Sequence, residues 1–326
     1  MSFQVSIIIP VYNVEKYMKR CVLSLFEQTL NSIEYIFVND YSTDASMHIL
    51  YQLLIKNSSR AACVKIVNHK TNRGSAAARN TGLNHARGKY IGWVDADDWV
   101  EPDMFEQLYK AAEANHSDIV WCDFYYSYVK YEKLMRQKDR LDPMVCIKHF
   151  LAEKRHAALW NKLVKRSLYV KNNISFLDGL NIWEDLRVIV QLFFYARKIT
   201  YIPEAYYHYA QYNMNSISVS AATPKITEIL GNAESLILFL KEKEIPGIDR
   251  YLNHLKLAAK QTLLFATDRH SFIQWRRLYA ESNRYIWSYS ALPLHLRFIG
   301  WCTSLGIWPI IDFWIYLKRK RGNNGL

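Results

Sequence analysis

The sequence lacks the cysteine pattern of a disulfide-rich or zinc-binding protein. Its five cysteines are scattered along 326 residues: Cys21, Cys63, Cys122, Cys146 and Cys302. No two of them form a Cys-x-x-Cys pair, so neither a disulfide framework nor a zinc site is predicted. The N-terminus also lacks the basic stretch with which a secretory signal peptide begins. These absences favour a reducing, cytoplasmic setting.

Glycine is absent from the segment PVYNVEKY, residues 10–17, which follows the first apolar run. A nucleotidyltransferase that makes nucleotide sugars usually has a Gly-rich, basic loop there to hold a triphosphate. The missing glycine therefore argues against that class. Half of the residues are hydrophobic and 22% are charged, which excludes a disordered chain. The length allows one large domain or two smaller ones.

Acidic residues are scarce in the last third of the chain. The formal net charge is +12. Residues 1–224 carry 27 basic and 22 acidic side chains, whereas residues 225–326 carry 15 and 8. Such a bias predicts an anionic partner, either membrane or nucleic acid, and a solvated basic face is the alternative. A nucleic-acid site requires basic and aromatic residues together on one face. The groove predicted below is acidic, so we expect no nucleic-acid partner.

Apolar runs alternate with helical patterns over the first hundred residues. The predicted strands lie at residues 5–13, 34–40, 63–69 and 89–95. The predicted helices lie between them, at residues 14–26, 42–57 and 75–88. Asn13 is expected to cap the first helix, and Ser42 or Thr43 the second. The alternation predicts an α/β fold with a mostly parallel sheet and helices on both faces.

Each predicted strand ends in polar residues. They are Pro10, Tyr12 and Asn13, then Asn39 and Asp40, then Asn72, Arg73 and Gly74, and finally Asp95, Asp97 and Asp98. One such cluster is ordinary turn chemistry. However, the carboxyl ends of parallel strands meet at one edge, where ligands bind. The three aspartates also repel one another unless a cation lies between them. Four clusters at one edge therefore favour a binding site.

Four segments carry a resemblance to a known family. SIIIPVYN, FVNDYSTD, NRGSAAARNTG and WVDADDWVEPD resemble, in order and spacing, the motifs of the family 2 glycosyltransferases, which have the GT-A fold. The resemblance covers roughly residues 4–220. It implies a nucleotide-sugar donor, a divalent metal and inversion at the anomeric carbon. The aspartates suit this chemistry, because Mg²⁺ and Mn²⁺ prefer oxygen ligands and neutralise the charge on a departing diphosphate.

The resemblance implies roles for single residues. Asp97 would bind the metal, and Asp95 would face the ribose with Asp98 nearby. Asp40 would hydrogen-bond the base. Arg79 would meet the base or the phosphates, unless it is a surface residue of its helix. The turn after the first strand would contact the nucleoside through Pro10, Tyr12 and Asn13.

One segment departs from the family pattern. The family commonly has Asp-Asp-Gly-Ser after the second strand, whereas this chain has NDYS at residues 39–42. Tyr41 stands where glycine would permit a positive φ. Either the turn tolerates Tyr41 by widening, or the ring stacks near the base.

The carboxylates Glu184 and Asp185 open an apolar helical segment. A sugar hydroxyl that attacks an anomeric carbon needs a base to accept its proton. The pair resembles the Glu-Asp motif of the family, in which the aspartate is the base. Asp185 is therefore the predicted base, and Glu184 would orient it or bind the acceptor. The alternative is structural, because a helix dipole favours carboxylates in the first turn.

Two further segments resemble the family less completely. In ALWNKLVKRSLY, Trp160 is a candidate sugar platform and Lys162 a candidate contact to phosphates or acceptor, although a tryptophan at helical spacing is more often in the core. In AYYHYAQYNMNSIS, His208 is a candidate metal or phosphate ligand. The usual arginine two residues later is missing, and a lone histidine is often structural. Phosphate contacts are also predicted for Asn215 and Ser216.

The last hundred residues have a different pattern. Residues 225–245 and 251–268 have the apolar spacing of amphipathic helices. Residues 298–317 form an apolar run long enough to span a bilayer, but Pro309 and Asp312 interrupt it. An interfacial or re-entrant hairpin is predicted, with Trp301, Trp308, Trp314 and Tyr316 as belt residues. Packing onto the catalytic domain or an oligomer contact is the alternative. Anionic lipids would attract Lys318, Arg319, Lys320 and Arg321.

The sequence thus predicts a GT-A-like catalytic domain at residues 1–220 and a helical, membrane-proximal region at residues 221–326. The predicted activity is metal-dependent, inverting transfer of a sugar to a glycan or lipid-linked glycan at the inner face of the cell membrane. Assembly of cell-surface polysaccharide or lipopolysaccharide would suit it, and self-association is allowed. The competing interpretations are a nucleotidyltransferase and a basic nucleic-acid-binding protein.

Overall fold

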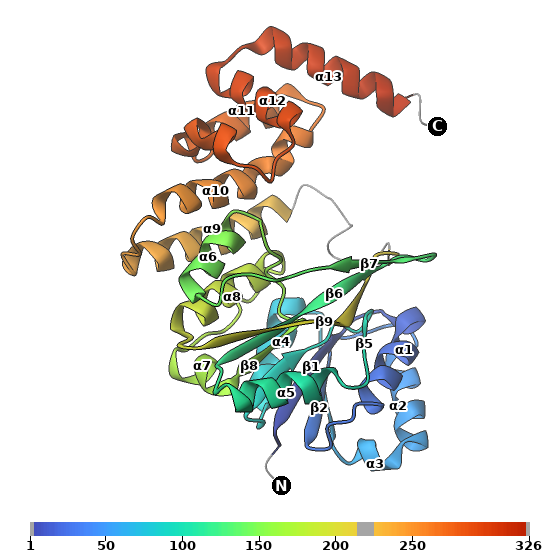
Figure 1. Ribbon diagram of the computed structural model, residues 1–326. Coiled ribbons are helices and arrows are strands. Elements are labelled where there is room, and N and C mark those ends of the chain that lie inside the picture. Colours follow the sequence, from blue (N-terminus) through green and yellow to red (C-terminus); the bar gives the residue numbers. More distant parts are fainter. Residues whose placement is uncertain (1–2, 214–224, 324–326) are drawn as a thin grey trace. The chain divides into compact units, whose positions relative to one another are not determined.

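The computed structural model describes residues 3–213 and 225–323, and it divides the chain into two compact units (Figure 1). The first unit comprises Met1–Ile147 and Ala157–Ala221. The second comprises Lys148–His156 and Ala222–Leu326. The sequence places the boundary between residues 220 and 221. The units divide one residue later, and the short segment 148–156 belongs to the second unit.

A mixed sheet forms the centre of the first unit, with nine strands among the described residues. Its order is β3-β2-β1-β4-β8-β6-β9-β5, and β7 pairs with β6. The predicted strands are β1 (Val5–Val11), β2 (Ile33–Asn39), β3 (Val64–Asn68) and β4 (Tyr90–Trp93), and they are parallel. β1, β2 and β4 are almost wholly buried, as expected for strands covered on both faces. This half of the sheet confirms the predicted α/β fold.

The other strands bring antiparallel pairs into the sheet. They are β5 (Trp99–Val100), β6 (Ile119–Ser127), β7 (Glu132–Met135), β8 (Lys162–Lys165) and β9 (Ile199–Ala210). β8 runs antiparallel to both β4 and β6, and β5 runs antiparallel to β9. β6 and β9 are parallel, with a register shift near Asp123. Their pairing brings β9 beside the loop that carries the three aspartates.

Helices cover both faces of the sheet, as the alternation predicts. On one face, Ile7 and Ile9 of β1 belong to a core shared with α1 (Glu15–Phe26), α2 (Ser46–Lys56) and α5 (Met104–Ala114). On the other face, Gly82 of α4 (Ser75–His85) lies against Ile8. The remaining helices are α3 (Ser58–Ala61), α6 (Pro143–Leu151), α7 (Arg166–Lys171) and α8 (Glu184–Tyr195).

The starts of α1 and α2 differ from the predicted caps. α1 begins at Glu15, and the side chain of Asn13 does not cap it. Instead Val14 N donates to Ser46 Oγ at 2.8 Å, and Glu15 N donates to Asp44 Oδ2 at 2.9 Å. In return Ala45 N donates to Glu15 Oε2 at 3.0 Å. The two N-termini therefore cap each other, and the predictions of Asn13, Ser42 and Thr43 as caps are wrong.

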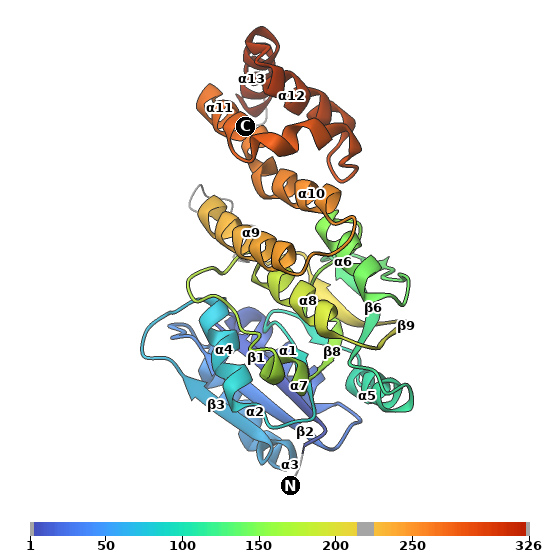
Figure 2. The ribbon, with the colours of Figure 1, turned by 90° about the vertical axis from the view of Figure 1, so that its left-hand side faces the viewer.

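The second unit is helical (Figure 2). Its elements are α9 (Lys225–Glu242), α10 (Asp249–Lys260), η1 (Gln261–Phe265), α11 (Arg269–Arg277), η2 (Ala280–Ser288), α12 (Leu294–Leu305) and α13 (Trp308–Asn323). The apolar run at residues 298–317 is split between α12 and α13 by Gly306, whose φ of +77° is readily adopted only by glycine. Within the described part of the chain, no helix is long and apolar enough to cross a membrane.

Candidate active site

The carboxyl edge of the parallel strands gathers most of the predicted site residues. Asp95 and Asp97 follow β4, Glu184 and Asp185 begin α8, and Arg79 lies on α4. They come from separate parts of the chain, yet direct contacts join four of them. The edge therefore carries one connected group of ionisable side chains.

Arg79 is the centre of this group. Its Nη2 lies 3.1 Å from Asp95 Oδ1, its Nη1 contacts Glu184 Oε1, and the same nitrogen lies 3.6 Å from Asp185 Oδ1. The guanidinium is almost completely buried. Burial disfavours its charge, but the three carboxylates outweigh burial and raise the pKa of Arg79. The surface interpretation of Arg79 is therefore not supported.

The carboxylates outnumber the positive charge beside them. Burial raises the pKa of Asp95 to about 6; Arg79 lowers it, and Asp97 and Asp185 raise it further. Burial likewise raises the pKa of Glu184 to about 8, against the effect of Arg79. Both shifts show that negative charge is costly here when no other cation is bound.

Asp97 and Asp98 have different surroundings although they are neighbours. Asp97 Oδ2 accepts a hydrogen bond from Asn213 Nδ2 at 2.8 Å, and burial raises its pKa. Asp98 is fully buried and accepts from Tyr207 Oη at 2.7 Å and from Ala210 N at 2.8 Å. Burial raises the pKa of Asp98 well above its usual range. Asp98 thus joins the loop to β9, and Asp97 keeps one carboxylate oxygen for another partner.

Asp185 has one oxygen for which residues 3–213 and 225–323 supply no hydrogen-bond partner. Its Oδ1 is buried and makes only the 3.6 Å ion pair with Arg79, while Oδ2 accepts from Leu159 N at 3.4 Å. Trp183, immediately before the pair, has a φ of +67°. A positive φ is strained for a bulky residue, and strained positions cluster at active sites.

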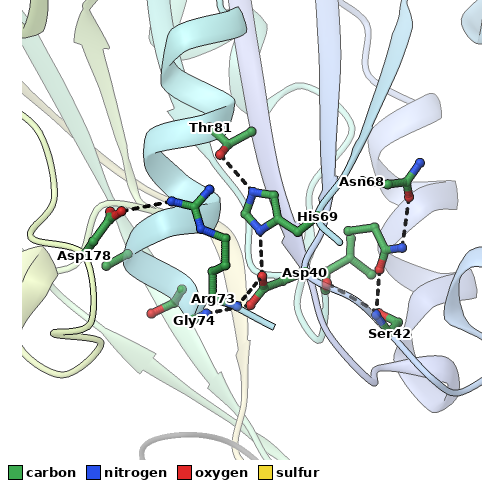
Figure 3. Close-up of polar contacts among 12 residues, drawn as sticks. Asp40, Ser42, Asn68, His69, Arg73, Gly74, Thr81 and Asp178 are labelled. Carbon is green, nitrogen blue, oxygen red and sulfur yellow. Dashed lines mark hydrogen bonds and ion pairs between the residues drawn. The ribbon is translucent and has the colours of Figure 1, made fainter. Parts of the chain in front are cut away.

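Asp40 lies in a network that holds the loop after β3 (Figure 3). Its Oδ1 accepts from Arg73 N at 2.8 Å and lies 2.7 Å from His69 Nδ1, and its Oδ2 accepts from Gly74 N at 2.8 Å. His69 Nε2 lies 2.9 Å from Thr81 Oγ1. Both oxygens of Asp40 are thus engaged within the protein. The predicted hydrogen bond between Asp40 and the base would therefore have to share an oxygen that already accepts a hydrogen bond within the protein.

The first two loops present exposed tyrosines. Tyr12 is 49% exposed and Tyr41 is 52% exposed. Asn13 uses its side-chain oxygen to accept from Thr43 N at 2.9 Å. Tyr41 has a φ of +65°, so the turn keeps the left-handed conformation that glycine would favour. Pro10 lies in β1 opposite Val38 of β2.

Trp160 and Lys162 lie in the interior. The ring of Trp160 stacks on Tyr207 at 4.4 Å between centroids, which fits the core alternative and not an exposed sugar platform. Lys162 Nζ donates to Ala158 O at 2.5 Å and to Asn161 Oδ1 at 2.8 Å. Burial lowers the pKa of Lys162 to about 7. A contact of Lys162 with the phosphates of the donor or with the acceptor substrate remains a prediction.

His208 has a carboxylate on each side. Its Nε2 lies 2.9 Å from Glu101 Oε1, its Nδ1 lies 2.8 Å from Glu132 Oε1, and its ring stacks on Trp99 and Tyr125. A metal would have to displace one of these carboxylates. Across residues 3–213 and 225–323, no three His, Cys, Asp or Glu side chains are grouped to hold a metal. The predicted contacts Asn215 and Ser216 lie outside the described residues.

Three site residues were missed by the sequence interpretation: Arg20, Tyr207 and Asn213. Arg20 Nη2 donates to Asp97 O at 3.3 Å, and its guanidinium lies 3.5 Å from the centre of the Trp99 ring. The sequence signal for Arg20 was its charge at a position between the apolar residues of α1. Tyr207 and Asn213 belong to β9 and the segment after it, whose place beside the aspartates depends on long-range pairing.

The family model described as Glycosyl transferase family 2 matches residues 6–174, which is more than half of the chain. The chain belongs to this family. It is 34% identical over 233 residues to the uncharacterized glycosyltransferase EpsJ of Bacillus subtilis (strain 168), and the match covers 69% of this chain and 66% of EpsJ, slightly less than two thirds of that relative. Membership confirms the resemblance inferred from the four segments.

Solved structures of similar fold include two ligand complexes. TarS 1–349 of S. aureus with UDP-GlcNAc has a TM-score of 0.72 at 18% identity, covering 95% of this chain and 90% of that one. The mannosyltransferase PcManGT of Pyrobaculum calidifontis with GDP-Man and Mn²⁺ has a TM-score of 0.54, also at 18% identity, covering 95% and 87%. At this identity the likeness concerns the fold, and it confirms the predicted GT-A-like architecture.

Proposed function

We propose that the protein is an inverting glycosyltransferase that moves a sugar from a nucleoside-diphosphate donor to an acceptor hydroxyl. The observation that carries the proposal is the buried Oδ1 of Asp185, which has no hydrogen-bond partner and lies beside Arg79. A carboxylate oxygen in this state keeps a lone pair for the proton of the attacking hydroxyl. Family membership supplies the reaction class.

The donor is proposed to bind at the carboxyl edge of the parallel strands. Asp95 would face the ribose, and Arg79 would lie close to the phosphates. Exposed Tyr12 is available to the base, as is the turn that contains Pro10 and Asn13. Asp40 would act by holding the loop of Arg73 and Gly74, or by sharing an oxygen with the base.

A divalent cation, Mg²⁺ or Mn²⁺, is the proposed cofactor, with Asp97 as its protein ligand. The chemistry of the residues fits, because Arg79 is the only cation in direct contact with Asp95, Glu184 and Asp185 among the described residues. A bound divalent ion supplies neutralisation of the charge on the departing diphosphate. Since no group of three protein ligands is present within the described ranges, oxygens from the donor would complete the site. His208 would join only by exchanging Glu101 or Glu132.

The transfer itself is proposed as a single displacement. The acceptor oxygen attacks the anomeric carbon from the side opposite the diphosphate, and Asp185 accepts its proton as the new C–O bond forms. The old bond breaks with its electron pair on the diphosphate oxygen, so the configuration inverts. Glu184 accepts from Ser75 Oγ at 3.0 Å and contacts Arg79, which suits a residue that positions the base.

The proposed acceptor is a hydroxyl of a glycan or lipid-linked glycan in cell-surface polysaccharide or lipopolysaccharide assembly. The basic second unit supports a location at the anionic inner face of the membrane, since residues 225–326 carry 15 basic and 8 acidic side chains. Self-association of the chain is compatible with this location.

A donor screen tests the proposal. The full-length protein is incubated with a panel of UDP- and GDP-sugars in the presence of Mn²⁺, and release of the nucleoside diphosphate is measured. We expect slow hydrolysis of one donor and its loss in excess chelator. If no nucleotide sugar is bound or hydrolysed, the proposed function is wrong.

A further inference from the structure

A cavity of about 420 Å³ lies in the second unit, and none of its lining residues belongs to the candidate active site. Its lining residues belong to the end of α11, to η2 and to α12. The side chains that give it chemical character are Arg276, Asn283, Arg284, Trp287, Trp301 and Leu305. Its lining therefore combines two guanidiniums with two indoles and an aliphatic side chain.

The two arginines have charge available for a ligand. Both are exposed, and neither has an ion-pair partner among the described residues. The nearby Glu281 is paired with Lys256 at 2.6 Å. The amide of Asn283 is also occupied, since it accepts from Lys260 Nζ at 2.5 Å and donates to Arg276 O at 3.0 Å. The charged side chains that line the cavity are therefore both cationic.

The cavity is also lined by exposed apolar side chains. Trp287 is 48% exposed, Trp301 is 37% exposed and Leu305 is 55% exposed. The rings of Trp287 and Trp301 lie 6.2 Å apart, and Phe298, which is also exposed, lies 6.2 Å from Trp301. Tryptophan is the side chain most characteristic of the layer where lipid headgroups meet acyl chains.

We propose that this cavity binds the phosphate headgroup of an anionic membrane phospholipid, with Arg276 and Arg284 on the phosphate and the two tryptophans at the level of the acyl chains. Guanidinium groups bind phosphate with paired hydrogen bonds. Residues 269–320 carry eight basic and two acidic side chains, so the surrounding surface attracts an anionic bilayer. A neutral glycan would suit the tryptophans but would leave both arginines unpaired.

The inference rests on the proposed location of the enzyme at the membrane, and it adds a specific site. A diffuse basic surface would treat all exposed arginines alike. A phosphate site predicts instead that Arg276 and Arg284 contribute more than Arg277, which is also exposed and follows Arg276 on α11 but does not line the cavity. Arg277 is therefore the matched control.

The test is co-sedimentation of full-length protein with vesicles of phosphatidylcholine alone and of phosphatidylcholine mixed with phosphatidylglycerol. We expect binding to the mixed vesicles only. Arg276→Ala and Arg284→Ala should each lower the partition coefficient about fivefold, and the double variant about 25-fold. Arg277→Ala should lower it by clearly less. Trp301→Phe should keep most of the binding and Trp301→Gln should lose it.

Four results would overturn the proposal. They are absence of binding to mixed vesicles, an equal loss in Arg277→Ala, displacement by a neutral oligosaccharide, and binding of free glycerol phosphate as tight as binding of vesicles. Donor hydrolysis is measured in parallel on each variant. It should stay at the level of the unmodified protein, so failure of the lipid site and failure of the proposed transferase activity are told apart.

Discussion

Arg79 shows how one buried residue organises the candidate site. The three carboxylates it contacts come from the segment after β4 and from the start of α8, so its guanidinium connects two distant parts of the chain. Its single charge leaves the group net negative. Binding of a cationic ligand is therefore favourable at this edge. A substitution that removes the charge of one carboxylate should have a different effect at each of the three positions.

The first prediction concerns metal dependence. Asp97→Ala should abolish stimulation of turnover by Mn²⁺ and weaken binding of the nucleoside diphosphate, because the proposed protein ligand of the cation is lost. Calorimetry of nucleoside diphosphate binding with and without Mn²⁺ gives the measurement. Full activity of the unmodified enzyme in excess chelator would contradict the prediction.

The second prediction separates the base from donor binding. Asp185→Asn keeps the shape of the side chain and removes its ability to accept a proton, so kcat should fall by about 10²–10⁴. Donor affinity should hardly change, since Asp185 is proposed to act on the acceptor. Steady-state kinetics with donor titration measure both. A collapse of donor affinity with kcat retained would assign Asp185 to the donor site.

The third prediction concerns pH and stability. The pKa of Glu184 is raised by burial from 4.5 to about 8, so the folded state prefers the protonated form. Its stabilising effect is present below pH 4.5 and is lost as pH rises towards about 8. In protein without bound donor, the unfolding temperature of Glu184→Gln should therefore decline less between pH 4.5 and about 8 than that of the unmodified protein. Parallel declines in both proteins would show that Glu184 does not titrate in this way.

At the scale of elements, strand and helix patterns predict the parallel half of the sheet well. β1, β2 and β4 are buried on both faces, so their sequences are continuous apolar runs that need no knowledge of the partner strand. β5 has only two residues, and β8 has a lysine at each end, so neither forms a continuous apolar run of its own. Their positions depend on pairing with β4, β6 and β9.

Local signals also fail where partners are distant in sequence. Trp160 is in the core because Tyr207 and Phe124 pack on it. Asn13 does not cap α1 because its side-chain oxygen accepts from Thr43 N, and Asp44, about thirty residues later, accepts from Glu15 N. The pair Glu184 and Asp185 was found from the family pattern, whereas the orphaned oxygen of Asp185 follows only from the folded chain.

The fourth prediction belongs to the edge of the sheet opposite the site. Glu34 in β2 is buried and accepts from Ser6 Oγ at 2.6 Å, Arg87 N at 2.5 Å and Gly88 N at 3.1 Å. Glu34→Ala removes the acceptor of Ser6 Oγ and of Arg87 N, while Gly88 N keeps Ser6 Oγ as a partner at 2.7 Å, and it should lower the free energy of unfolding by about 3 kcal/mol. Lys89→Ala, which removes a partly exposed ion pair with Glu113 and leaves Tyr90 Oη its acceptor, should cost about 1 kcal/mol or less. Equal losses in urea unfolding would refute the distinction.

At the scale of the whole molecule, the segment 148–156 belongs to the second unit although it interrupts the first unit in sequence. It leaves the first unit after Ile147 and returns at Ala157. Within the second unit Glu153 accepts from Tyr289 Oη and from Gln261 Nε2, and Lys148 lies 5.9 Å from the ring of Tyr251. A cut after residue 221 therefore does not separate two complete domains.

The fifth prediction follows from this interruption. A chain truncated after Ala221 should be less stable than the full-length protein and should bind more of a hydrophobic dye, because 148–156 has lost the helices it packs against. Thermal unfolding and dye fluorescence measure both effects. A second truncation that also replaces 148–156 by a short Gly-Ser linker should reduce dye binding. Unchanged melting and dye binding after the simple truncation would mean that the first unit is self-sufficient.

The same segment sets an order of events during synthesis on the ribosome. His156 is made 170 residues before the C-terminal Leu326. At about 5–20 residues per second, the end of α6 waits about 10–30 s for the helices that complete its unit. During that time Phe150 and Leu151, which are buried in the finished protein, have no partners from residues 222–326. The nascent chain thus passes through a stage in which the sheet can form while a loop in its middle still exposes apolar side chains to chaperones and proteases.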